Sequence, residues 1–202
     1  MKKLYCLSLF LLFTFQISAS NIDSLQLILN NVKTDKQKVT LLQQIGETYK
    51  QKGDFPNAII TFNKAIDLNP NKLILLEIWY DIATAKARLQ EYNEALEQCN
   101  RIIAEDSPDQ KLLAKTYSLM SNLKLSLGET NESYELQYKS LQISETINDT
   151  LGLLLASYQI GTIHFYQNNY KNEEQHFIKI CKRKKYNSIF FSIFSINHTW
   201  CL

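Results

Sequence analysis

The sequence predicts an all-α protein built from repeated pairs of antiparallel helices, and three observations carry this prediction. The 202 residues include only 5 Gly and 3 Pro, whereas these two residue types together make up about 12% of an average protein. Apolar residues make up 45% and charged residues 21% of the chain, a balance that suits packed cores and excludes a disordered chain. Similar helical segments return at intervals of 37 and 40 residues, which is typical of helical repeat proteins.

Residues 1–20 have the features of a secretory signal peptide. Lys2 and Lys3 give a positive start, residues 4–15 are apolar, and residues 18–20 are small. The apolar stretch is too short to span a bilayer about 30 Å thick as a lasting helix. We therefore expect cleavage of this segment and an exported protein, either periplasmic or secreted, with an uncleaved membrane anchor as the alternative.

Residues 21–35 are expected to form a short N-terminal helix, over 22–32, and a linker. The apolar residues of this helix keep a helical period; they are Ile22, Leu25, Ile28, Leu29 and Val32. Such a helix can cover the open end of the first repeat, as the termini of stacked repeats require.

The first repeat is the most clearly marked segment of the chain. One helical stripe is formed by Leu42, Ile45, Gly46 and Tyr49. Glycine inside a helix costs about 1 kcal/mol relative to alanine, so Gly46 predicts a close approach of a second helix. That second helix carries Ala58 and Phe62 and is expected to start after Gly53-Asp54 and to be stopped by Pro70.

Three further copies follow with decreasing clarity. They comprise Trp79, Ile82, Ala83, Tyr92, Ala95 and Cys99; Tyr117, Met120, Ser121, Gly128, Ser133 and Gln137; and Ser157, Ile160, Gly161, Tyr170 and Phe177. In the last copy Glu173 stands where a small residue is expected, so this repeat is incomplete.

These residues resemble the tetratricopeptide repeat (TPR) pattern, with Leu42 in place of the usual tryptophan of the first copy. The resemblance implies a right-handed superhelical solenoid of antiparallel helix pairs over residues 36–180, with about four repeats. The expected helices span 36–52, 55–68, 72–89, 92–105, 109–127, 131–147, 150–167 and 170–180. Repeats of about 40 residues behind a signal peptide resemble the exported sensory half of bacterial TPR-containing sensor kinases and regulators.

Residues 181–202 form an atypical basic and apolar tail that no longer follows the repeat. Four consecutive basic residues at 182–185 precede a stretch rich in Phe, Ile, Ser and Asn. A membrane helix needs about 18 apolar residues, more than this stretch provides. A membrane-surface segment and a disrupted reading frame are the remaining interpretations, and we favour the frame disruption.

The charge distribution excludes a nucleic-acid binder. The formal net charge is +2, yet residues 21–176 contain 15 basic and 20 acidic residues, a net charge of −5. Affinity for the phosphate backbone of nucleic acids depends on clustered Lys and Arg residues, which residues 21–176 lack.

The sequence predicts no catalytic, cofactor or metal site. Nucleophile, P-loop, zinc-protease and dinucleotide motifs are absent from the sequence. The spacing of His176, Cys181, His198 and Cys201 is irregular for structural zinc, and His164 and Cys99 fit buried core positions better than reactive ones. A metal-dependent enzyme that uses the tail His and Cys residues is the disfavoured alternative.

The expected function is non-catalytic binding of a protein or peptide in a groove lined by the first helix of each pair. The candidate residues lie one step round each helix from its packing stripe; they are Gln43, Glu47, Tyr80, Thr84, Ser118, Asn122, Tyr158 and Thr162. Simple solvated surface is the competing interpretation of these positions. The resemblance implies the truncated sensory part of a signal-transduction regulator, and a complete secreted adaptor is the alternative.

Overall fold

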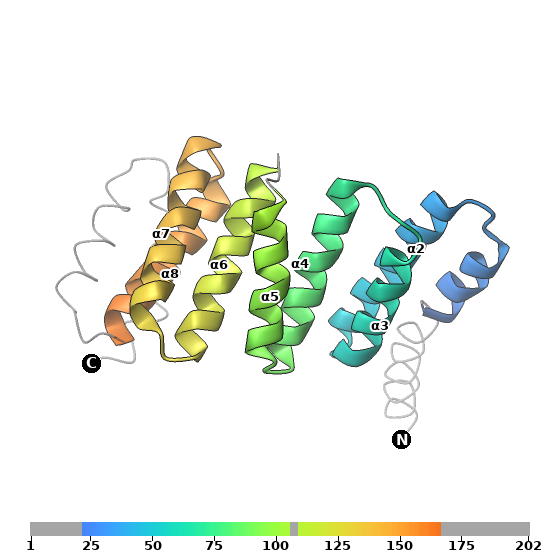
Figure 1. Cartoon of the computed structure of the whole chain (residues 1–202), viewed down its shortest axis with the longest axis horizontal. Coiled ribbons are helices and arrows are strands. Elements are labelled where there is room, and N and C mark those ends of the chain that lie inside the picture. Colours follow the sequence, from blue (N-terminus) through green and yellow to red (C-terminus); the bar gives the residue numbers. More distant parts are fainter. Residues whose placement is uncertain (1–21, 106–108, 167–202) are drawn as a thin grey trace, which may run out of the picture. The chain divides into compact units, whose positions relative to one another are not determined.

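The computed structural model describes residues 22–105 and 109–166, whose regular secondary structure is entirely α-helical (Figure 1). The chain divides into two compact units, and the division falls between Glu91 and Tyr92. The all-α prediction is confirmed for the described residues. The predicted signal peptide, the helix at 170–180 and the tail lie outside them.

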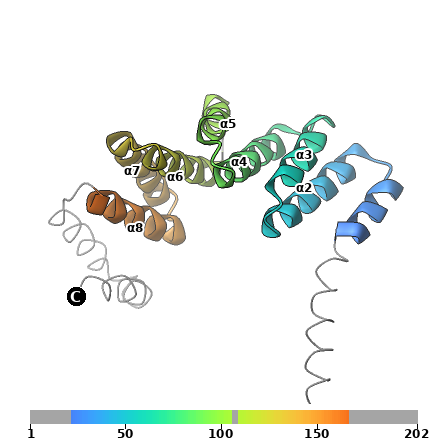
Figure 2. The ribbon, with the colours of Figure 1, turned by 90° about the horizontal axis from the view of Figure 1, so that it is seen from below.

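Unit 1 comprises the described residues up to Glu91 and contains four helices in chain order. They are a helix over 22–31, α2 (Asp35–Gln51), α3 (Phe55–Ile66) and α4 (Lys72–Arg88). Helices α2 and α3 pack as an antiparallel pair and α4 packs on α3 (Figures 1 and 2).

Unit 2 comprises the described residues from Tyr92 onward and also contains four helices. They are α5 (Tyr92–Ala104), α6 (Gln110–Ser126), α7 (Thr130–Thr146) and α8 (Thr150–Tyr166). Neighbouring helices pack in sequence order, and α6 also contacts α8 (Figures 1 and 2). In both units, the helix bounds differ from those expected from the sequence by at most two residues.

The turns between helices are set by residues with positive φ. They are Gly53 at 78°, Asn69 at 51°, Gln90 at 63°, Gly128 at 81° and Asn148 at 55°. A left-handed residue just past a helix end allows backbone amides to satisfy the last carbonyl groups. The expectation that Pro70 stops the second helix was wrong, because α3 ends at Ile66 and Asn69 already turns the chain.

The core of unit 1 joins α2, α3 and α4 around Phe62. Its buried residues are Leu42, Ala58, Phe62, Ala65, Ile78 and Ile82, and Leu29 of the first helix packs against them. A Cβ atom at Gly46 would lie 2.5 Å from Cε1 of Phe62, so only glycine fits between α2 and this ring. The predicted close approach at Gly46 is therefore confirmed.

The core of unit 2 is more polar than that of unit 1. Helices α6 and α7 cross at Ser121 and Ser133, where each hydroxyl group donates to the backbone carbonyl of the other residue, at 2.8 and 2.9 Å. Helix α7 also buries Gln137 completely, at the position that corresponds to Phe62 in the first repeat. Polar side chains thus replace part of the apolar packing seen in unit 1.

Candidate binding surfaces

Unit 1 carries the first half of the predicted groove residues on two helices that lie next to each other. Gln43 and Glu47 lie on α2, and Tyr80 and Thr84 lie on α4; all four are partly exposed. The ammonium group of Lys50 joins the two helices, since it lies 2.7 Å from the Asp81 carboxylate and 2.9 Å from that of Glu47.

These ion pairs determine the electrostatics around Glu47 and Asp81. Burial alone would lower the pKa of Lys50, but the hydrogen bonds and charges of Asp81 and Glu47 outweigh burial and raise it. Lys50 is therefore charged at neutral pH and balances part of the negative charge of the two carboxylates. Because one Lys faces two acids, the surface between α2 and α4 keeps an acidic character.

Unit 2 carries the second half of the predicted residues, again on neighbouring helices. Ser118 and Asn122 lie on α6, and Tyr158 and Thr162 lie on α8. The hydroxyl group of Ser118 donates to Oε1 of Gln159 at 2.9 Å, which ties the exposed faces of α6 and α8 together. Four of the eight predicted residues thus lie on each unit.

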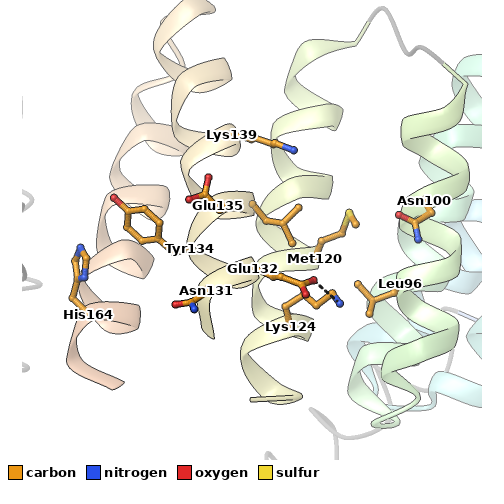
Figure 3. Close-up of a pocket in the computed structure, with 11 residues that line it drawn as sticks. Leu96, Asn100, Met120, Lys124, Asn131, Glu132, Tyr134, Glu135, Lys139 and His164 are labelled. Atoms are coloured by element: carbon orange, nitrogen blue, oxygen red, sulfur yellow. Dashed lines mark ion pairs between the residues drawn. The ribbon is translucent and has the colours of Figure 1, made fainter. Parts of the chain in front are cut away.

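A recess of about 700 Å³ in unit 2 was not predicted from the sequence (Figure 3). Helices α5, α6 and α7 form most of it, and α8 contributes His164. Its lining residues are Leu96, Asn100, Met120, Lys124, Asn131, Glu132, Tyr134, Glu135, Leu136, Lys139 and His164. These residues come from four helices and share no sequence spacing, so no pattern along the chain could have indicated the recess.

The recess is lined by two Lys and two Glu residues, and one pair of them, Lys124 and Glu132, forms an ion pair. Lys124 pairs with Glu129 and, at 2.8 Å, with Glu132 (Figure 3). Hydrogen bonds to Glu129 and Glu132 raise the pKa of Lys124, and the Lys124 ammonium lowers the pKa of Glu132. This network leaves little net charge with which to attract an ionic ligand.

His164 is buried, as the sequence suggested for a packed core histidine. Its ring lies against Tyr134 with 5.3 Å between the ring centroids, and its side chain is 9% exposed. Within the described residues, its Nδ1 atom has no hydrogen-bond partner.

Metal and thiol chemistry finds no support in the part of the chain that the structure describes. No group of three or more His, Cys, Asp or Glu residues lies close enough there to hold a metal ion. Burial raises the pKa of Cys99 to about 12, so this thiol stays protonated, as expected for a core residue. The set of His176, Cys181, His198 and Cys201 lies outside the described residues.

None of the described helices combines the length and the apolar character that crossing a bilayer requires.

The architecture of paired antiparallel helices defines an all-α solenoid fold. The family model described as tetratricopeptide repeat matches residues 39–72, which hold most of α2 and all of α3. The first repeat read from the sequence is therefore a tetratricopeptide repeat. A comparison with curated proteins gives no significant match.

Solved structures share the fold at low sequence identity. A crystal structure of MamA protein is 20% identical with a TM-score of 0.64, and the alignment covers 87% of each chain. Aspartyl phosphate phosphatase F from Bacillus subtilis is 18% identical with a TM-score of 0.74, covering 81% of this chain and 45% of that one. Rap protein complexed with Competence and Sporulation Factor is 16% identical with a TM-score of 0.73, covering 92% and 55%. The chain thus has the fold of a TPR-like solenoid.

Proposed function

We propose that this protein is a non-catalytic TPR scaffold that binds a protein or peptide through the exposed faces of α2 with α4 and of α6 with α8. The observation that carries the proposal is the alignment of polar and aromatic side chains on neighbouring helices, tied by the hydrogen bond between Ser118 and Gln159. Such mixed surfaces suit peptide recognition, because they offer hydrogen bonds beside apolar and aromatic contacts.

The similar structures support partner binding, but they do not decide whether the fold is catalytic. A similar structure contains Rap protein complexed with Competence and Sporulation Factor, so this fold can hold a partner. Another is named an aspartyl phosphate phosphatase, so the fold alone does not exclude catalysis. The absence of catalysis is therefore part of the proposal and rests on the lack of a recognisable catalytic arrangement among the described side chains.

Peptide display tests the binding proposal. The purified protein should select peptides from a random library, and Tyr80→Glu or Tyr158→Glu should reduce recovery of those peptides because each places a charge on one of the two surfaces. Tyr138→Glu is the matched control, since Tyr138 is an exposed tyrosine of α7 outside both surfaces. Equal recovery by all variants would reject the two surfaces.

The finer proposal concerns compartment and context. We propose that residues 1–20 direct export and that the chain is the sensory portion of a signal-transduction regulator, with a complete secreted adaptor as the alternative. Residues 1–20 fused to a reporter that is active only outside the cytoplasm should give activity; an inactive fusion would reject export. The DNA that follows codon 202 distinguishes the two alternatives. An intact longer reading frame downstream supports the truncated regulator, and a clean intergenic region supports the adaptor.

The metal-dependent enzyme is the remaining alternative. It requires the His and Cys residues of the tail, so deletion of residues 181–202 should abolish bound zinc and any hydrolysis if it is correct. Unchanged behaviour after deletion favours the scaffold.

A further inference from the structure

The exposed surface of unit 2 formed by α6 and α8 has an unusual charge balance. Helix α6 carries Lys111, Lys115 and Lys124 and no acidic residue, and α8 contains no Asp, Glu, Lys or Arg. Lys124 points to the recess and is paired there, whereas Lys111 and Lys115 are exposed. A basic surface therefore lies on a chain whose residues 21–176 carry a net charge of −5.

The exposed side chains of the two helices form parallel rows with spacings of four, three and four residues. The α6 row is Lys111, Lys115, Ser118 and Asn122, and the α8 row is Leu151, Leu155, Tyr158 and Thr162. Residues at these intervals share one face of a helix. The eight residues are called the α6/α8 surface below.

Two contacts place both rows on the same side of unit 2. The hydroxyl of Ser118 in the first row bonds Gln159, the neighbour of Tyr158 in the second row. At the other end, the Lys111 ammonium lies 3.8 Å from the carboxylate of Asp149, just before α8 begins. The two lysines and the leucines of α8 therefore belong to one surface.

The α8 row contains three apolar side chains that are exposed to solvent. Leu151 is 60%, Leu155 54% and Tyr158 36% exposed. Three such residues in succession on one helix face are typical of a contact surface rather than of scattered surface apolar residues. Two acids lie near the lysines: Asp109 caps the start of α6, and Asp149, whose side chain is 17% exposed, is directed to Lys111. Neither is paired with Lys115 by an ion pair that the structure shows among the described residues.

Resting on the proposed function, we propose that the α6/α8 surface binds a short peptide segment that combines acidic with apolar side chains. Its carboxylates pair with Lys111 and Lys115, and its apolar side chains cover Leu151, Leu155 and Tyr158. The amide of Asn122 faces the peptide backbone, and the hydroxyl oxygens of Ser118 and Thr162, which donate within the protein, accept from it. From Lys111 to Asn122 the helix rises about 16 Å, which matches about five residues of extended peptide.

An anionic membrane is the other occupant that this chemistry could attract, and the observations favour the peptide. Stable attraction to a charged membrane surface takes clusters of about 4–8 Lys or Arg residues. The α6/α8 surface offers two, and it combines them with polar side chains that suit backbone hydrogen bonds.

The face of α2 and α4 in unit 1 provides a contrast within the same protein. Its exposed rows include Glu47 and Glu77, and Asp81 lies beside them. With Lys36 and Lys50 counted beside these three acids, the face carries a net charge of −1. An acidic peptide is therefore less favoured there, and binding should depend on unit 2.

Fluorescence anisotropy with a defined probe tests the proposal. A fluorescein-labelled peptide of sequence Gly-Glu-Leu-Asp-Phe-Glu-Gly should bind the full chain at least about tenfold more tightly than the same peptide with Lys at each acidic position. The double variant Lys111→Glu with Lys115→Glu should weaken the acidic probe by about tenfold or more, because two attractions become repulsions. Leu155→Ser should weaken it several-fold. Lys139→Glu, an exposed lysine on α7, is the matched control and should leave binding within twofold.

Each outcome decides the proposal. Equal binding of the two probes, or no effect of the double lysine variant, overturns it. If the protein sediments with phosphatidylglycerol vesicles and does not bind the peptide probe, the proposal is overturned and the surface binds a membrane. If displayed peptides bind through Tyr158 but are not acidic, the scaffold function stands and this inference fails. If display selects no peptide at all, both fail.

Discussion

Replacing Gln137 with methionine should stabilise unit 2. Gln137 is fully buried on α7, and neither Nε2 nor Oε1 of its amide has a hydrogen-bond partner within the described residues. A buried polar group without partners costs about 1–3 kcal/mol in proteins. Methionine is unbranched and of similar size, so it fills the same space and removes both unpaired atoms. We expect the free energy of unfolding to rise by about 1–3 kcal/mol.

Urea unfolding followed by circular dichroism measures this gain, and hydrogen exchange assigns it to unit 2. The amides of α7 should exchange more slowly by a factor that matches the gain in free energy, since 1.4 kcal/mol corresponds to about tenfold. Gln142→Met is the matched control because Gln142 is exposed on the same helix, and its effect should stay within about 0.5 kcal/mol. A Gln137→Met protein with unchanged or lower stability would show that the amide is hydrogen-bonded in solution and would refute the reasoning.

Three further predictions concern packing, hydrogen bonding and charge. Gly46→Ala should destabilise unit 1 by about 1–2 kcal/mol despite better helix propensity, because the new Cβ lies 2.5 Å from Phe62; adding Phe62→Leu should recover part of the cost in a double-mutant cycle by urea unfolding. Ser121→Ala should cost about 1 kcal/mol because it removes the donor to the backbone carbonyl of Ser133 and the contact between the two hydroxyl groups, which lie 3.0 Å apart. Alanine at both positions should cost less than the sum of the single changes because that shared contact is lost only once; additive losses would contradict this. Lys50→Met should cost about 1–2 kcal/mol at pH 7. The ion pairs raise the pKa of Lys50 in the folded state above its ordinary value of 10.5. Their contribution to the free energy of unfolding is therefore complete below pH 10.5 and should be lost as the pH rises through the folded-state pKa. A stability difference between the two proteins that stays constant from pH 7 to pH 12 would argue against the ion pairs.

The helices could be predicted from the sequence because local signals agree with the packing. Asp54 caps α3 with its side chain at 3.3 Å from the amide of Asn57, and Gly53 makes the turn before it. Gly46 is costly in a helix unless another element approaches closely, and Phe62 is that element. In each case the local conformational preference of one residue agrees with its place in the tertiary structure, so the sequence alone could indicate that place.

Other features depend on contacts that no local pattern specifies. Gln90 adopts a left-handed conformation although glutamine has no special preference for it, because three residues must connect α4 and α5. The mutual hydrogen bonds of Ser121 and Ser133 require two helices to meet at those positions. The sequence indicated small residues there, but it gave no sign that their hydroxyl groups would bond each other.

The candidate surface residues were found by a simple rule of helix geometry, namely one step round from the packing stripe. The rule predicts exposure alone, because a helix in a solenoid has one buried face, and all eight residues are at least partly exposed. It could not separate the two surfaces by charge, since the ion pairs of Lys50 and the exposure of Lys115 depend on which helices adjoin them. The recess escaped the rule because its residues come from four helices.

The polar interior of α7 connects the stability of unit 2 with its proposed binding function. The buried positions of this helix include Ser133, Gln137, Ser140 and Ser144, whereas the corresponding helix of unit 1 buries Ala58, Phe62 and Ala65. Apolar burial contributes about 25 cal/mol per Å², so a core of serine and glutamine contributes less than one built round a phenylalanine ring. Helix α7 therefore contributes less apolar burial to its unit than α3 does. A ligand that binds only the folded state stabilises it by RT ln(1 + [L]/Kd), about 2.7 kcal/mol at one hundred times Kd. An acidic peptide on the α6/α8 surface should consequently slow hydrogen exchange in α6, α7 and α8 and leave α2 and α3 unchanged.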